Sequence, residues 1–191
     1  MAEALREKEK GEKDKIETSD KKTTETKGGE QEEGSLTKPV VSKWSILNPR
    51  FVWGGGKCKR RNFIGRVTIS ECFRVSFDLK VHGQHGNHWA SILHIGAVDG
   101  ERIPGVWFHP GTLQLHVRVS DIEDGNRGYD PNSLCEIGET YHIEVESLKD
   151  GTVTFKLNGK VITTRGDVVV LTKFQAPIFA GDPWFVHAFF F

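Results

Sequence analysis

The sequence predicts an all-β fold, an antiparallel two-sheet jelly-roll sandwich behind a disordered N-terminal tail. From Cys72 to His82 apolar and polar residues alternate without a break, which is the pattern of a strand buried on one face. The same alternation returns over 113–119, 141–147 and 152–157. A shift of one residue would expose a whole apolar row, so the register of each strand is well specified. No amphipathic helix of normal length interrupts these strands, as expected of a sandwich.

Composition divides the chain into two parts. Residues 1–40 contain no aromatic residue and are dense in Lys, Glu, Asp and Thr. Such a segment cannot bury enough apolar surface to offset the entropy of ordering. We therefore predict a disordered charged tail over 1–40 and a concanavalin A-like jelly-roll domain, argued below, over 41–191, which contains every Trp, Tyr and Phe.

Turn-forming residues separate the other expected strands. Pro49 cannot donate to a sheet ladder and follows a short apolar stretch, and three glycines at 54–56 end the next stretch. Asn158-Gly159 is the strongest hairpin signal in the chain. The remaining expected strands lie over 40–47, 51–53, 63–69, 88–98, 106–108 and 161–164, and a long polar connection covers 120–133.

Charge and hydropathy limit the partners and the location of the protein. A formal net charge of zero argues against a general nucleic-acid binder, so no nucleic acid is predicted as a partner. No apolar run approaches the 18 or so residues that span a bilayer, and the N-terminus lacks the apolar core of a signal peptide. Three cysteines without metal-pair spacing are expected to be reduced thiols. We therefore expect a cytoplasmic protein, or one exported without a signal peptide.

The order of the strand motifs resembles the concanavalin A-like lectin/glucanase superfamily, particularly its laminin-G-like and galectin-like jelly rolls. The resemblance covers about residues 62–191. It rests on Phe-Arg-Val-Ser-Phe-Asp-Leu-Lys at 73–80, Ser-Ile-Leu-His-Ile-Gly at 91–96, Gly-Val-Trp-Phe-His-Pro-Gly-Thr-Leu-Gln-Leu-His-Val-Arg-Val at 105–119, Gly-Glu-Thr-Tyr-His-Ile-Glu-Val at 138–145, Val-Thr-Phe-Lys-Leu-Asn-Gly at 153–159 and Gly-Asp-Pro-Trp at 181–184. It implies two packed antiparallel sheets whose concave face or rim loops bind glycans, proteins or calcium.

One strand offers a candidate glycan site. Gln114, His116 and Arg118 are two residues apart and therefore share a face. A sugar site needs planar hydrogen-bonding groups beside an aromatic ring. Galectins carry a similar His-x-Asn-x-Arg row, where this chain has Gln114 for the His and lacks the Asn at the middle position. The predicted ligand-binding residues are Gln114, His116, Arg118, Trp89, Trp107, Asn126 and Arg127. An ordinary solvated strand face, with the tryptophans in the core, is the alternative.

The polar connection also carries a candidate calcium site. Asp121, Asp124 and Asp130 supply the oxygen ligands that a hard cation prefers, although their spacing is not that of an EF-hand. The resemblance to laminin-G-like domains implies calcium at such a rim, and a plain acidic turn is the alternative. No other cofactor is predicted. The loop histidines His82, His85 and His88 are interpreted as unligated.

These observations predict a non-catalytic recognition module that binds a glycan or glycoprotein. The first alternative is a protein–protein interaction module of the same fold, and the second is a divergent glucan hydrolase. Hydrolases of this superfamily place carboxylates at positions i, i+2 and i+4 of one strand. Here Glu144 and Glu146 are flanked on the same face by His142 and Leu148, so the third carboxylate is missing and no enzyme is predicted.

Overall fold

The computed structural model describes residues 40–47, 51–53 and 55–184 of the chain. Except for Val40, the predicted N-terminal tail lies outside them. The described residues form strands and no helix. The strands are β1 (Val40–Leu47), β2 (Phe51–Trp53), β3 (Gly56–Lys57), β4 (Phe63–Ile69), β5 (Phe73–Lys80), β6 (Ala90–Ile95), β7 (Gly105–Phe108), β8 (Leu115–Arg118), β9 (Gly128–Tyr129), β10 (Thr140–Ser147), β11 (Val153–Leu157), β12 (Lys160–Arg165) and β13 (Lys173–Phe179).

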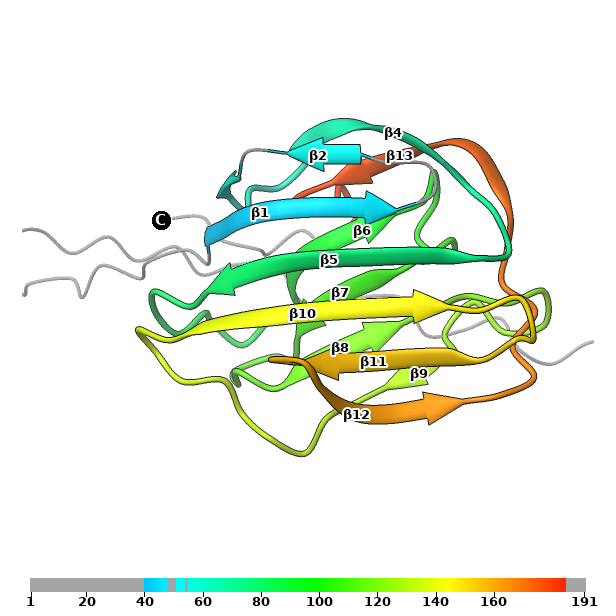
Figure 1. Cartoon of the computed structure of the whole chain (residues 1–191). Coiled ribbons are helices and arrows are strands. Elements are labelled where there is room, and N and C mark those ends of the chain that lie inside the picture. Colours follow the sequence, from blue (N-terminus) through cyan, green and yellow to red (C-terminus); the bar gives the residue numbers. More distant parts are fainter. Residues whose placement is uncertain (1–39, 48–50, 54, 185–191) are drawn as a thin grey trace, which may run out of the picture. The chain divides into compact units, whose positions relative to one another are not determined.

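The strands form two antiparallel sheets that pack face to face. Sheet A has the order β12-β11-β10-β5-β1-β2, with β3 also paired to β1. Sheet B has the order β4-β13-β6-β7-β8-β9. Figure 1 shows sheet A as the front layer, with β6, β7 and β8 crossing behind it. The prediction of an all-β, two-sheet antiparallel jelly-roll sandwich is confirmed.

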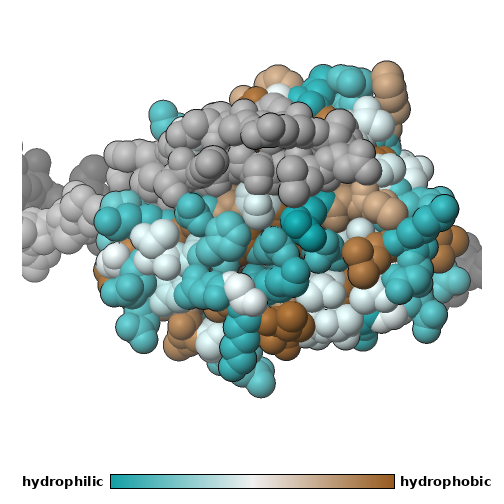
Figure 2. Space-filling view, in the orientation of Figure 1, coloured by the Kyte–Doolittle hydropathy of each residue, from teal (hydrophilic) through white to brown (hydrophobic). Residues whose placement is uncertain are grey.

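Sheet A realises the alternation that the sequence shows. In β5 the side chains of Phe73, Val75, Phe77 and Leu79 are buried, while the residues between them are not. Strand β10 pairs beside it with Ile143 opposite Phe77, so the apolar rows of both strands face the core. Polar residues occupy the outer face, and Figure 2 shows that much of this surface is hydrophilic. One face of sheet A therefore closes the core, as the period of two requires.

The central strands of sheet B are buried on both faces. Every residue of β6, β7 and β8 is buried, including polar residues that alternate with the apolar row. His116 and Arg118 are each only 9% exposed, so the predicted polar row is not an open face. The reason is tertiary, because Asp130 contacts His116 and Arg118, and the carbonyl oxygen of Pro131 accepts a hydrogen bond from Gln114. The structure also shortens the strands expected over 88–98 and 113–119.

The polar connection after β8 contains a strand that the sequence did not indicate. Strand β9 pairs with β8, placing Gly128 opposite Arg118 and Tyr129 opposite Val117. A Cβ atom at Gly128 would lie 2.1 Å from the carbonyl oxygen of Val117, so glycine is required for this close approach. In the described part of the chain no helix is long and apolar enough to cross a membrane.

Candidate functional site

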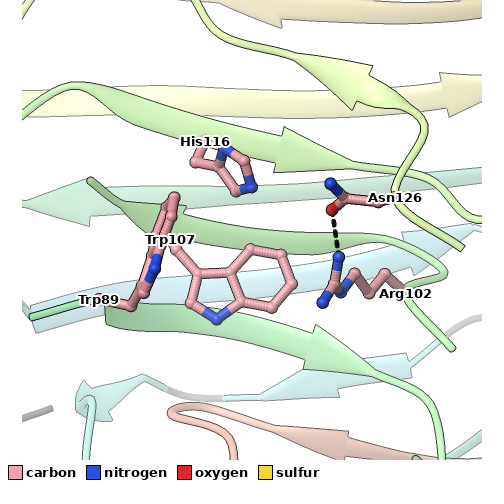
Figure 3. Close-up of a pocket in the computed structure, with 5 residues that line it drawn as sticks. All are labelled: Trp89, Arg102, Trp107, His116 and Asn126. Carbon is pink, nitrogen blue, oxygen red and sulfur yellow. Dashed lines mark hydrogen bonds between the residues drawn. The ribbon is translucent and has the colours of Figure 1, made fainter. Parts of the chain in front are cut away.

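A pocket of about 310 Å³ opens on the outer face of sheet B. It is lined by Trp89, Arg102, Trp107, His116 and Asn126 (Figure 3). Trp107 and His116 come from β7 and β8, and Trp89 directly precedes β6. The other two come from the loops that follow β6 and β8. The sandwich therefore brings together residues that lie up to 37 positions apart in the sequence (126 − 89).

Trp107 forms the floor of the pocket. It is 2% exposed, and its indole Nε1 donates a hydrogen bond of 2.7 Å to Oδ2 of Asp182. The ring lies over Gly105, where a Cβ atom would be 2.0 Å from Cη2 of the indole. The guanidinium of Arg102 is 5.4 Å from the ring centroid, within the range of a cation–π contact. The indole is thus fixed both at its edge and on its faces.

Arg102 supplies polar groups on one side of the pocket. Its Nε donates to the carbonyl oxygen of Asp99 at 3.0 Å, and its Nη2 donates to Oδ1 of the same residue at 3.2 Å. Nη1 donates to Oδ1 of Asn126, as the dashed line in Figure 3 marks. The amide NH₂ of Asn126 carries two further donors. Because Asp99 offsets the charge of Arg102, this side offers hydrogen bonds without a strong net charge.

Ser120 holds the two loops of this side together. It is fully buried, and its Oγ accepts a hydrogen bond of 3.0 Å from the backbone N–H of Arg102. The same oxygen lies 2.8 Å from the carbonyl oxygen of Gly100 and 2.7 Å from that of Gly125. One hydroxyl therefore positions both Arg102 and the turn that presents Asn126.

His116 and Trp89 form the opposite side of the pocket. Their ring centroids are 4.5 Å apart, and Nδ1 of His116 is 2.8 Å from Oδ1 of Asp130. Burial, helped by the charge of Arg118, lowers the pKa of His116 to about 4, so the imidazole is neutral at pH 7. Burial raises the pKa of Asp130, but its hydrogen bonds and charge interactions with Arg118 and His116 outweigh this and lower it overall. The ionised Asp130 only accepts, so Nδ1 of His116 donates and Nε2 remains an acceptor.

The structure places Arg118 and Gln114 away from the pocket lining. Arg118 binds Asp130 through two hydrogen bonds, of 2.9 and 3.0 Å, and its Nη1 also donates to the carbonyl oxygens of Val117 and Tyr129. The amide of Gln114 donates to the carbonyl oxygen of Pro131 at 3.0 Å. Both side chains hold the segment after β9 in place, and His116 alone of the predicted row lines the pocket.

Of the two ligand-binding residues predicted in the loop after β8, only one lines the pocket. Asn126 lines the pocket, whereas Nε of Arg127 is 2.7 Å from Oδ2 of Asp121. Oδ1 of Asp121 accepts backbone hydrogen bonds from Glu123 and Asp124, at 2.9 and 2.6 Å. The buried Asp121 therefore closes the turn. The structure does not bring Asp121, Asp124 and Asp130 into one cluster of metal-ligating atoms within the described residues.

Two other candidate groups from the sequence, a loop histidine and a pair of carboxylates, contact residues outside the pocket. Nε2 of His85 lies 2.6 Å from the carbonyl oxygen of Thr112. Glu144 and Glu146 lie on β10, and Lys156 Nζ contacts both carboxylates, at 2.5 and 3.0 Å. Arg74 also contacts Glu146. The carboxylate pair considered for glucan hydrolysis is therefore bound in an ion-pair network of sheet A, on the other sheet from the pocket.

Sequence reasoning missed Arg102 and Asp182. Arg102 follows a turn that the sequence marks only as a break between strands, and nothing local distinguishes it from a surface arginine. Asp182 belongs to the Gly-Asp-Pro-Trp motif at 181–184, which in the sequence indicates only the superfamily resemblance. An aspartate in an otherwise apolar C-terminal stretch was the available signal, because a buried carboxylate requires a hydrogen-bond donor.

Comparison with known proteins finds similarity to solved structures only at a low level. The native heptameric SAP-like pentraxin from Limulus polyphemus is 14% identical, with a TM-score of 0.42, and the match covers 74% of this chain and 62% of that chain. The binding domain of Paraclostridial Mosquitocidal Protein 1 is 9% identical, with a TM-score of 0.33, covering 73% and 44%. The chain thus spans less than two thirds of either protein. No family model and no curated protein matches the sequence. Membership of the concanavalin A-like superfamily stays a prediction.

Proposed function

We propose that this domain is a non-catalytic recognition module that binds a carbohydrate in the pocket of sheet B. The observation that carries the proposal is the combination of two indole rings with hydrogen-bonding groups of both kinds in one pocket. Trp89 offers an apolar ring, Trp107 closes the floor, Asn126 offers donors, and Nε2 of His116 offers an acceptor. A sugar ring presents C–H faces together with hydroxyls that both donate and accept, and so matches this lining.

The charges around the pocket favour a neutral ligand. Arg102 is paired with Asp99, and Arg118 is paired with Asp130. His116 is neutral at pH 7 because burial lowers its pKa to about 4. A strongly anionic or cationic ligand would have to compete with these internal pairs, whereas sugar hydroxyls need only the remaining donors and acceptors.

A glycan array with the full chain, followed by calorimetric titration of the best ligand, tests the proposal. The Trp89→Ala variant should bind at least about tenfold more weakly, which is about 1.4 kcal/mol of binding free energy. The matched control is Gln114→Ala, because this residue belongs to the predicted polar row but lies off the pocket; its affinity should stay within about twofold of the wild type. Thermal melting checks that both variants fold.

Two results would contradict the carbohydrate proposal. One is a blank array with folded protein. The other is a sugar ligand whose affinity falls with Gln114→Ala and not with Trp89→Ala, which would place the site elsewhere. Repeating the array with calcium and with a chelator separates any contribution of a bound cation from that of the pocket.

Protein recognition is a second candidate, favoured by an apolar surface at one end of the sandwich. Phe174 is 79% exposed and Val169 is 58% exposed. Phe174 lines a groove of about 560 Å³, and Val169 lines a neighbouring groove of about 420 Å³ that shares Glu71 and Lys149 with it. Because single exposed apolar side chains are common, the specific support is that both lie at grooves that share two lining residues. A Phe174→Ser variant that loses a purified partner while keeping sugar binding would assign the two surfaces separately.

A further inference from the structure

Three potential metal-ligating side chains converge beside the pocket. His109 follows β7, His116 lies in β8, and Asp130 follows β9. One nitrogen of each imidazole and one carboxylate oxygen all lie within 4.8 Å of one another. Oδ1 of Asp130 is 3.4 Å from Nε2 of His109 and 2.8 Å from Nδ1 of His116. In the described part of the chain this is the one such group of three.

Two of the three distances between ligand atoms are near those of a tetrahedral zinc site, and the third, between the two imidazole nitrogens, is within 4.8 Å and must come into the same range. Zinc binds nitrogen and oxygen at about 2.0–2.2 Å, so ligand atoms of a tetrahedral site are about 3.3–3.5 Å apart. The distance between Asp130 and His109 is already in that range. The distance between Asp130 and His116 must lengthen by about half an ångström, since a metal ion would replace the hydrogen bond there.

One ligand atom of the group lacks a hydrogen bond. Nε2 of His109 is shielded from solvent and has no hydrogen-bond partner among the described residues. It faces the same oxygen of Asp130 that His116 contacts. This nitrogen has a 3.4 Å contact with Asp130 in place of a hydrogen bond, and coordination of a metal ion would satisfy it. This observation is independent of the clustering and also indicates a ligand at this point.

Neighbouring residues hold the three ligand side chains in position and leave room for the ion. Arg118 donates to both carboxylate oxygens of Asp130 and so fixes the carboxylate, as partners of metal ligands commonly do. Its positive charge lowers the affinity for a cation, so a moderate rather than a tight site is expected. Trp89 packs on both imidazoles, at 4.8 and 4.5 Å between ring centroids. Asp130 is exposed, which leaves a path for the ion to enter.

We propose that His109 Nε2, His116 Nδ1 and Asp130 Oδ1 bind a divalent ion of the zinc class, with the fourth position open to water or a ligand. Two imidazoles and one carboxylate favour zinc or a similar transition metal over calcium, which prefers oxygen ligands alone. This inference does not depend on the carbohydrate proposal, because titration with zinc alone measures it whether or not a sugar binds.

Calorimetric titration of the metal-free full chain with zinc alone tests the site, and cobalt provides a spectroscopic probe of the same ligands. The wild type should bind one equivalent, and cobalt should give the visible absorption of a four- or five-coordinate ion. His109→Ala should weaken binding at least about tenfold. The matched control is His82→Ala, an exposed histidine outside the cluster, whose affinity should equal that of the wild type.

Histidine ring NMR keeps the test decisive if a variant is unstable. In the wild type, zinc should shift the signals of His109 Nε2 and His116 Nδ1. The absence of one-to-one binding would overturn the proposal, as would equal weakening by His109→Ala and His82→Ala. Ring shifts confined to other histidines would also overturn it.

Discussion

The indole Nε1 of Trp107 donates a hydrogen bond of 2.7 Å to Asp182, a residue 75 positions later in the chain. Asp182 is 1% exposed, and its other carboxylate oxygen accepts the backbone N–H of Trp184 at 3.1 Å. Its own backbone N–H donates to Oγ of Ser91 in β6. One carboxylate thus ties the floor of the pocket to the end of the described chain.

Removal of this carboxylate should destabilise the protein. Asp182→Ala leaves the buried indole N–H unpaired, which costs about 1–3 kcal/mol of unfolding free energy. Asp182→Asn keeps an acceptor oxygen and should lose less. Urea unfolding followed by tryptophan fluorescence measures both. An Asp182→Ala protein as stable as the wild type would show that the hydrogen bond does not contribute to the free energy of unfolding.

A side chain added at Gly105 should destabilise the protein, because the Trp107 indole covers this position. In Gly105→Ala the new Cβ would lie 2.0 Å from the Trp107 ring, so the indole must move and the pocket floor with it. Overpacking of this kind costs about 1–3 kcal/mol. Gly86→Ala is the matched control, since a Cβ there meets nothing within 4 Å. Thermal unfolding of the two variants should separate clearly, and equal melting temperatures would refute this account.

Two buried histidines should make the fold sensitive to mild acid. Burial lowers the pKa of His94 to about 4; the charge of Arg102 acts in the same direction, and Asp182 and Asp99 oppose it. Burial likewise lowers the pKa of His116 to about 4. Their ordinary value is 6.5, so below that pH the unfolded chain binds protons that the folded chain excludes. The stability that these two histidines contribute should therefore be complete above about pH 7 and be lost as the pH drops through the window from 6.5 to 4.

Urea midpoints measured between about pH 7.5 and about pH 5 check this window. His94→Gln cannot titrate and should flatten part of the pH dependence, and His116→Gln should flatten another part. Carboxylates with lowered pKa values, such as Glu101 and Glu146, remain ionised in this range and contribute loss only at lower pH. A flat wild-type profile above pH 5 would contradict the prediction.

Arg118 should stabilise the protein by fixing Asp130. It does not line the pocket, so we do not expect it to touch a ligand. Arg118→Lys cannot form both hydrogen bonds to the carboxylate, because an ammonium lacks the planar fork of guanidinium. We expect a loss of about 1–3 kcal/mol in unfolding free energy. Arg127→Lys is the control, since Arg127 is more exposed and makes one close contact with Asp121, and should cost less. Equal losses of unfolding free energy in the two variants would show that the pair of hydrogen bonds from Arg118 to Asp130 adds no more stability than the single contact of Arg127.

The central strands of sheet A follow from the sequence because their pattern is local, whereas β3 lies at the glycine run that predicts a break. In β5 a strict alternation of apolar and polar residues places Val75 and Phe77 in the core and Ser76 outside. A period of two has no other way to bury one apolar row, so register and facing are determined residue by residue. The same reasoning holds for β10, and the two-sheet fold class follows from several such strands together.

The pocket could be predicted only in part. Four of its five lining residues were among the predicted ligand residues, because Trp, His and Asn are the residue types that sugar binding needs. Their grouping was not predictable. Gln114 and Arg118 share a strand face with His116, yet the segment after β9 covers them and leaves only His116 at the pocket.

The sequence by itself determined an all-β sandwich and the residue types available for recognition, since both depend on composition and on short-range alternation. The tertiary structure decided which side chains meet. Arg102, Asp182 and the contact of His109 with Asp130 come from loops whose paths depend on strand pairing far away in the chain. Loop closure over the outer face of sheet B converts a row that reads as exposed into a buried, hydrogen-bonded layer. No local pattern encodes that closure, because its contacts join residues 12 to 17 positions apart, beyond the reach of a period of two.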